Sequence, residues 1–198
     1  MAELQDSPAT PPAVVTLLAS LLQRVVEAND LRSRQDRRRI SVFDGLTRPS
    51  ISVQSYLERI FRYANCSPSC FVVAYVYLDR FAQKQPLLPI GSFNVHRLLI
   101  TSVLVSAKFM DDMSYNNAYY AKVGGISTAE MNLLEVDFLF GLGFSLNVTP
   151  NTFHTYCSYL QREMVLNNSQ LVLASPSSTS AHFCSSEEEP THQQELAV

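Results

Sequence analysis

The residues that could carry chemistry are few, and two of them stand three positions apart near the end of the chain. His154 and Cys157 have the types needed for a base and a nucleophile, because an imidazole within hydrogen-bond reach of a thiol can activate it. Such a pair also needs a third group that orients the base, and the sequence shows none. His154 falls on the apolar side of its predicted helix, so we expect a packed residue there instead.

Other reaction motifs are missing from the sequence. It contains no G-x-S-x-G elbow, no P-loop, no H-E-x-x-H zinc motif and no His/Cys spacing typical of a metal site. Gly124-Gly125 is a weak phosphate cradle and a better helix end. The four cysteines form no C-x-x-C pair, which favours reduced thiols in an intracellular protein. We therefore expect no enzyme, cofactor or metal site, and a function that lies in a surface.

A lysine ends the most apolar segment of the chain. Residues 98–107 are nearly all small or apolar, and Lys108 follows them directly. Its stem could lie along apolar surface with the ammonium in water, and its charge would suit the negative end of a helix dipole. Alternatively, Lys108 is contacted by another protein. The residues alone leave both interpretations open.

The charge distribution argues against several classes of function. A net charge of −3 gives no general attraction for nucleic acid or an anionic membrane. The longest nearly apolar stretch is about half as long as a bilayer span requires, and no signal peptide is evident. The basic residues 32–39 could contact phosphate, act as a nuclear import signal, or form a solvated loop or helix end. We expect an intracellular protein, in the nucleus, the cytoplasm or both.

Helix-end signals and apolar spacing predict an all-α fold. Ser67 precedes a proline at the first helical position, Asn94 stands where a second N-cap is expected, and Ser127 with Glu130 has the form of a capping box. No period-two strand pattern is convincing. The expected helices cover residues 14–26, 53–64, 67–81, 94–110, 116–123, 127–142 and 150–164.

The third and fourth of these helices should form the core, because they are apolar on nearly every face. The chain ends differ in composition. Residues 165–198 are rich in serine and glutamate, and burial there cannot offset chain entropy, so we expect a disordered tail. We also expect disorder in residues 1–11. One helical domain is therefore predicted over residues 12–164.

Several strings in this region resemble the cyclin box. SCFVVAYVYLDRF at 69–81 is similar to the second helix of that family, and SAKFMDD at 106–112 resembles the end of its third. LEVDFLFGLGFSLNVTP at 134–150 has the family's spacing of glutamate, leucine and phenylalanine, beginning at Glu135. NNAYYAKVGGIS at 116–127 narrows the resemblance to the P-type cyclins, called U-type in plants, which are similar to the yeast cyclin of phosphate signalling.

The resemblance implies one five-helix box, with its core at about 50–148 and one flanking helix on each side. It also implies a function. Cyclins perform no chemistry. They activate a cyclin-dependent serine/threonine kinase by packing helices against its movable C-helix, which completes the kinase's Lys–Glu pair. Control of cell division or of phosphate-linked signalling is the implied setting.

By the same resemblance, Lys108 and Glu135 match the lysine and glutamate that hydrogen-bond kinase backbone beside the C-helix. The other interpretation is an intramolecular pair that merely closes the domain. Asp112 matches an acid that approaches the kinase activation loop in the phosphate-signalling relatives, where a carboxylate stands in for a phosphate. Otherwise Asp112 is a solvated acid at a helix end.

Apolar and aromatic neighbours would complete this kinase-binding surface. Phe109 and Met113 would supply contact area around the charges. Tyr119, together with Tyr115 and Tyr120, either joins the surface or packs the short helix 116–123 against the core.

The resemblance is incomplete in one helix and in length. SVQSYLERIF lacks the Met-Arg-x-x-Leu pattern with which some cyclins dock substrates, and the chain has room for only one box. Two further functions remain open: a cyclin-like transcription or nucleic-acid adaptor, supported only by residues 32–39, and a decoy that binds the kinase without activating it. Neither a membrane nor a nucleic acid is an expected partner.

Overall fold

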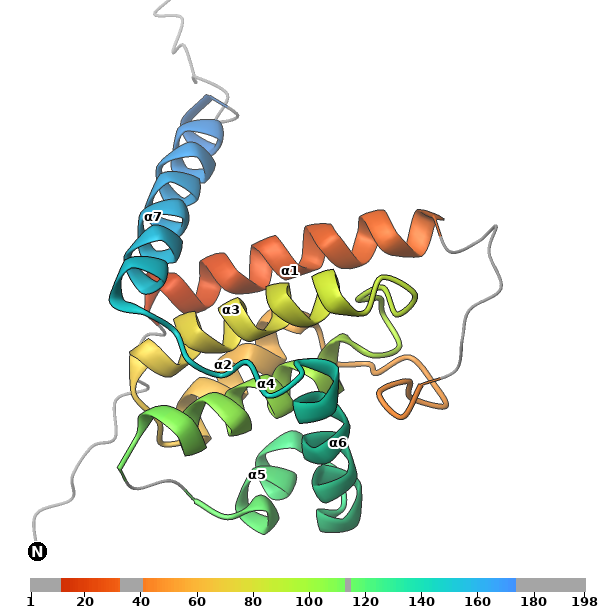
Figure 1. The fold of residues 1–198 in the computed structure, drawn as a ribbon. Coiled ribbons are helices and arrows are strands. Elements are labelled where there is room, and N and C mark those ends of the chain that lie inside the picture. The colour runs from red at the N-terminus through yellow and green to blue at the C-terminus, as the bar shows by residue number, and fades with distance from the viewer. Residues whose placement is uncertain (1–11, 33–40, 113–114, 174–198) are drawn as a thin grey trace, which may run out of the picture.

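The computed structural model describes residues 12–32, 41–112 and 115–173, with side chains as far as Leu166. In these residues the chain forms seven helices and no strand, which confirms the all-α prediction (Figure 1). The helices are α1 Ala13–Arg32, α2 Val53–Tyr63, α3 Pro68–Lys84, α4 Val95–Met110, α5 Asn117–Gly124, α6 Thr128–Gly141 and α7 Pro150–Leu173.

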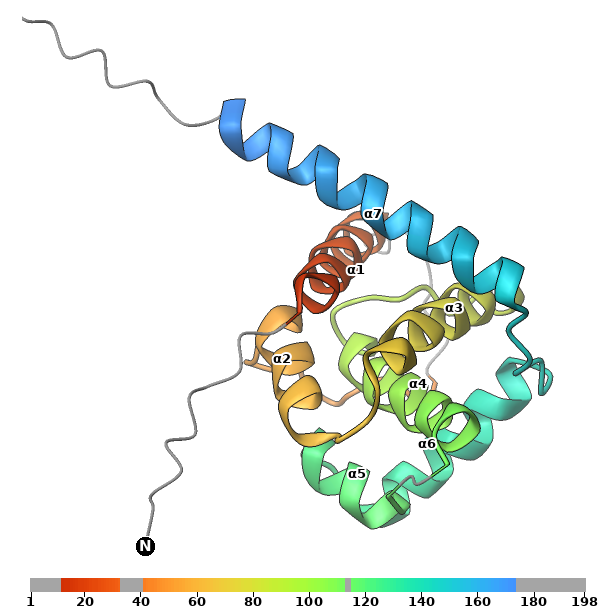
Figure 2. The same cartoon turned by 90° about the vertical axis from the view of Figure 1, so that its left-hand side faces the viewer.

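Helix α4 lies at the centre of the fold and packs against α2, α3, α5 and α6 (Figure 2). Every residue from Leu98 to Ala107 is buried. The hydroxyls of Thr101, Ser102 and Ser106 donate to carbonyls of the preceding turn, so they need no partner outside the helix. Helix α4 can therefore be surrounded on all sides, as its apolar sequence predicts.

Four helices surround α4, and α1 and α7 form an outer layer. Helix α3 is its main partner, and α5 and α6 pack against each other on another side. Helix α1 packs on α2 and α3, while α7 begins against α3 and crosses α1 (Figures 1 and 2). Helix α7 continues to Leu173, past the domain end expected at residue 164. Residues 165–173 of the tail where we expect disorder are therefore helical. The rest of that tail, 174–198, and the segment 1–11 lie outside the described residues.

Two of the predicted helix ends are confirmed and one is corrected. Ser127 Oγ accepts from the Glu130 backbone N–H, and the Glu130 carboxylate accepts from the Ser127 N–H, which completes the capping box. Gly125 ends α5 with a left-handed φ of 73°. Asn94 precedes α4, but its side chain makes no cap bond. Its Oδ1 accepts from Gly91 N–H at 2.8 Å, so this side chain holds the preceding turn instead.

Candidate functional site

The buried part of α4 stops at Ala107. Lys108, Phe109 and Met110 emerge together into solvent, and Phe109 remains 49% exposed. Phe109 and Met110 thus place apolar surface directly beside the charge of Lys108. The last turn of α4 therefore presents side chains outward, whereas the turns before it hold the core.

Lys108 forms an ion pair with α6. Its Nζ lies 2.7 Å from Glu135 Oε1, and the two side chains retain 35% and 16% of their exposure. The second carboxylate oxygen of Glu135 accepts from Asn117 Nδ2, also at 2.7 Å. The predicted pairing of Lys108 with Glu135 is thus present in the chain alone. The ammonium keeps further donors, and the carboxylate keeps further lone pairs, for a partner.

The two aspartates that follow α4 have different environments. Asp111 Oδ2 accepts from the Ser67 backbone N–H at 3.2 Å and from Cys70 Sγ at 3.3 Å. It thereby ties the end of α4 to the start of α3, where Ser67 itself makes no side-chain cap bond. Asp112 is exposed and forms no hydrogen bond or ion pair with the residues that the structure describes. Of the two aspartates, Asp112 is the one without a side-chain bond to the described residues.

The three predicted tyrosines differ in how deeply they are buried. Tyr120 is buried. The Tyr119 hydroxyl donates to the Tyr63 carbonyl at 2.6 Å, so it fastens α5 to the end of α2. Tyr115 stacks on Tyr119 with ring centroids 4.0 Å apart and stays 44% exposed. Of the three, Tyr115 offers the most contact area. Met113, the remaining predicted contact, lies outside the described residues.

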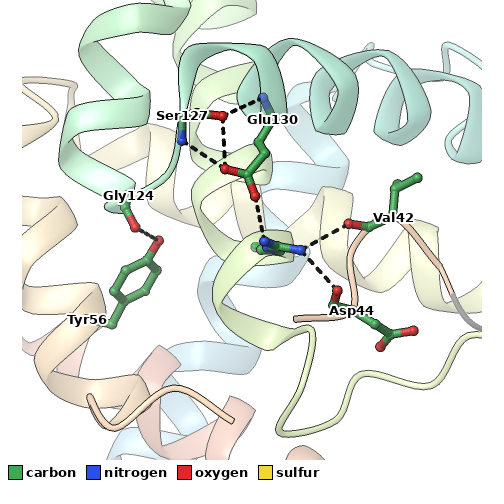
Figure 3. Close-up of polar contacts among 7 residues, drawn as sticks. Val42, Asp44, Tyr56, Gly124, Ser127 and Glu130 are labelled. Atoms are coloured by element: carbon green, nitrogen blue, oxygen red, sulfur yellow. Dashed lines mark hydrogen bonds and ion pairs between the residues drawn. The ribbon is translucent and has the colours of Figure 1, made fainter. Parts of the chain in front are cut away.

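A second ion pair also joins α4 to α6. Arg97 Nη2 lies 2.7 Å from Glu130 Oε1, and Arg97 Nη1 donates to the backbone oxygens of Asp44 at 3.0 Å and Val42 at 3.4 Å. The other Glu130 oxygen belongs to the capping box with Ser127 (Figure 3). These backbone and hydroxyl bonds from Ser127 lower the pKa of Glu130, and Arg97 adds to the effect.

The base–nucleophile pair finds no support in the geometry. His154 is exposed, so our expectation of a packed histidine is wrong. Helix α7 packs through Phe153, Tyr156, Cys157 and Leu160, and position 154 is turned about 100° away from Phe153. Among the described residues, no cluster of three His, Cys, Asp or Glu could hold a metal. In the same part of the chain, no helix has the length and hydropathy to cross a membrane.

Comparisons with known proteins agree with this architecture. The family model described as Cyclin matches residues 12–146. The chain is 63% identical to Cyclin-U4-1 of Arabidopsis thaliana, with 100% of both chains covered.

The chain belongs to the cyclin family. It is also 62% identical to Cyclin-P4-1 of rice, Oryza sativa subsp. japonica, over 77% of this chain and 74% of that one. Cyclin-U1-1 of Arabidopsis thaliana is 44% identical over 81% and 78%. The predicted U-type or P-type character is confirmed. Cyclins are non-catalytic regulatory subunits that bind cyclin-dependent kinases, so the prediction of a chain that is not an enzyme is confirmed as well.

Sequence reasoning missed Asn117 in this cyclin. It is the first residue of α5 and follows the N-cap Asn116. Nothing in its local sequence distinguishes it from any other polar residue at a helix start. Its contact with Glu135 depends on how α5 packs against α6, which no periodicity reveals. The basic segment is the other unresolved prediction, since only Arg32 of residues 32–39 is described.

Proposed function

We propose that this cyclin binds a cyclin-dependent serine/threonine kinase through the α4–α6 edge, defined as Lys108, Phe109, Asp112 and Glu135, and that binding activates the kinase. The observation that carries the proposal is the partly exposed Lys108–Glu135 pair at the point where α4 leaves the core. Partly exposed ion pairs contribute little to folding, about 0–1 kcal/mol. A pair with unused donors and acceptors beside the exposed ring of Phe109 is better suited to recognition.

The chemistry of the pair suits backbone recognition. An ammonium donates to carbonyls, and a carboxylate accepts from N–H groups. A helix or loop that lies over this edge can therefore satisfy one of each, while Phe109 provides apolar contact next to them. The cyclin binds the active kinase conformation more tightly than the inactive one, and the difference in affinity sets how far the population shifts.

Asp112 contributes a separate interaction in this proposal. It faces the arginines of the kinase activation loop and takes the place of a phosphate there, since a carboxylate can pair with guanidinium groups. Its support is its exposure, together with its lack of an intramolecular bond to the described residues. The neighbouring Asp111 is less suited to this role, because its Oδ2 already accepts bonds from Ser67 and Cys70.

The proposal is tested by co-purification of the full chain with a panel of cyclin-dependent kinases, followed by a histone kinase assay. Lys108→Glu and Glu135→Lys should each abolish the complex, and Glu27→Lys on the exposed side of α1 is the matched control that should not. Helical content measured by circular dichroism should stay the same in all three. Retained binding by both edge variants would reject the edge as the interface.

The kinase assay separates an activator from a decoy. A complex that phosphorylates histone supports activation, and an inactive complex that stays inactive after activation-loop phosphorylation supports the decoy. No observation in the described residues favours the nucleic-acid adaptor.

A further inference from the structure

Asn117 is bonded to the recognition pair from the side opposite to Lys108. Its Nδ2 lies 2.7 Å from Glu135 Oε2 and 2.8 Å from Asn132 Oδ1. A carboxylate only accepts hydrogen bonds, so the amide NH₂ group of Asn117 must face Glu135. Its two hydrogens are then divided between Glu135 and Asn132. The orientation of the amide is thus determined by its partners.

One atom of Asn117 has no partner in this arrangement. With its NH₂ group committed, Asn117 leaves its Oδ1 buried and without a hydrogen-bond partner in the described residues. A buried polar atom in that state is unfavourable, and native structures contain few of them. Asn117 therefore gives both of its N–H donors to α6 and leaves its acceptor unused among the described residues.

The backbone around Asn117 is well fixed. The side chain of Asn116 caps α5 by accepting from the Tyr119 backbone N–H at 3.1 Å. Helix α5 packs along α6, and the Tyr119 hydroxyl bonds to the end of α2. Asn117 thus stands on a rigid helix start, whereas Lys108 has four rotatable side-chain bonds and is the more exposed partner of Glu135. Of the two groups that bond to Glu135, Asn117 is the one able to fix it.

We infer that Asn117 is a positioning residue for kinase recognition: it holds the Glu135 carboxylate in the orientation in which Glu135 and Lys108 together meet kinase backbone. This inference rests on the proposed kinase-binding function. A carboxylate held at one oxygen by an amide and at the other by an ammonium loses little freedom when a partner binds. Preorganisation of this kind raises affinity without adding a contact to the partner.

Two substitutions at this position separate positioning from packing. Asn117→Ala removes the donor, and the affinity for the kinase should fall about tenfold. Asn117→Asp keeps the shape and places an acid in the first turn of α5, where the helix dipole favours it. If Asn117 only packed α5 against α6, Asn117→Asp would lower stability and leave the kinase affinity of the folded protein unchanged. A positioning role predicts a greater loss than with alanine, because two carboxylates would then face each other.

The decisive experiment is a double-mutant cycle on full-length protein with the kinase that binds best in the panel, measured by isothermal titration calorimetry. In the Glu135→Ala background, Asn117→Ala should have no further effect, because its action passes through Glu135. Asn132→Ala is the matched control, since it leaves the Asn117–Glu135 bond in place and should bind within about twofold of wild type.

Three results would overturn the inference: wild-type affinity for Asn117→Ala, an equal loss with and without Glu135, or an Asn117→Asp variant that binds as well as the alanine variant. Each of these leaves kinase binding by the wild-type chain intact. Failure of the wild-type chain to bind any kinase rejects the proposed function itself, so the two failures are distinguishable.

Discussion

The same two helices, α4 and α6, are joined by two ion pairs of equal length and different character. Arg97–Glu130 and Lys108–Glu135 both measure 2.7 Å. In the first pair, the Arg97 guanidinium also donates to backbone oxygens, and the Glu130 carboxylate also accepts from a helix cap. Nearly all of its hydrogen-bonding groups are therefore bonded within the fold. The second has donors and acceptors to spare beside the exposed ring of Phe109.

The length of an ion pair therefore says less about its role than the hydrogen-bond donors and acceptors that the pair leaves unbonded. Arg97 lies in the first turn of α4, where loop 41–45 closes over it, and Lys108 lies in the last turn, where the helix leaves the core. In our proposal, the position along α4 decides which pair fastens the domain and which one faces a partner. Four predictions test this difference, beginning with the largest expected effect.

Glu135→Ala should weaken kinase binding by about 2–5 kcal/mol, roughly 30-fold or more, because Lys108 is left without its partner at the interface. The free energy of unfolding should change by less than about 1 kcal/mol, since the pair is partly exposed. Calorimetric titration and urea denaturation measure the two quantities. A large loss of stability with unchanged affinity would mean that this pair fastens the domain like the other one.

Arg97→Ala should do the opposite. It removes the bonds to Glu130 and to the backbone of Asp44 and Val42, and stability should fall by about 2 kcal/mol. Kinase affinity should stay within about twofold at a temperature where the variant is folded. Urea denaturation checks the first effect and titration the second. If Arg97→Ala had normal stability but no longer bound the kinase, the kinase would contact the Arg97–Glu130 pair instead, which would contradict our proposal.

Asp111→Asn and Asp112→Asn extend the same distinction to two adjacent residues. Asp111→Asn weakens the bonds to Ser67 N–H and Cys70 and should lower stability by about 1 kcal/mol. Asp112→Asn should leave stability unchanged and reduce histone phosphorylation by a kinase whose activation loop carries no phosphate. Thermal denaturation and the kinase assay distinguish them. Equal behaviour of both variants would contradict a separate role for Asp112.

The smallest effect concerns pH. The pKa of Glu130 is lowered in the folded state, so its carboxylate contributes stability that is fully present above the ordinary value of 4.5. That contribution is lost as the pH falls through the lower folded pKa. Glu130→Gln should therefore reduce the drop in stability between neutral pH and about pH 3. Thermal midpoints across that range provide the measurement, and an unchanged pH profile would contradict the assignment.

Local signals predicted much of this fold. The capping box at Ser127 needs only four consecutive residues, and the burial of α4 follows from an apolar run that ends abruptly at Lys108. The same abrupt end drew attention to the α4–α6 edge. Structural features that depend on a few neighbouring residues can therefore be predicted from the sequence.

The misses depend on contacts between distant elements or on rotation about a helix axis. Asn117 and Glu135 are 18 residues apart, and only the packing of α5 on α6 brings them together. Asn94 could serve either its helix or the preceding turn, and contact with Asp44 from a distant loop accompanies the second choice. Our prediction that His154 is packed is wrong because neighbouring residues of a helix point in directions about 100° apart, so an error of one position decides whether a side chain faces the core.

The most direct measurement exchanges the charges of Lys108 and Glu135. The double variant Lys108→Glu/Glu135→Lys keeps an ion pair between α4 and α6 but reverses its polarity. If the kinase reads Lys108 as a donor and Glu135 as an acceptor, the double variant should remain folded and still fail to bind. Restored binding and histone phosphorylation would contradict this, and would show that the pair only closes the domain.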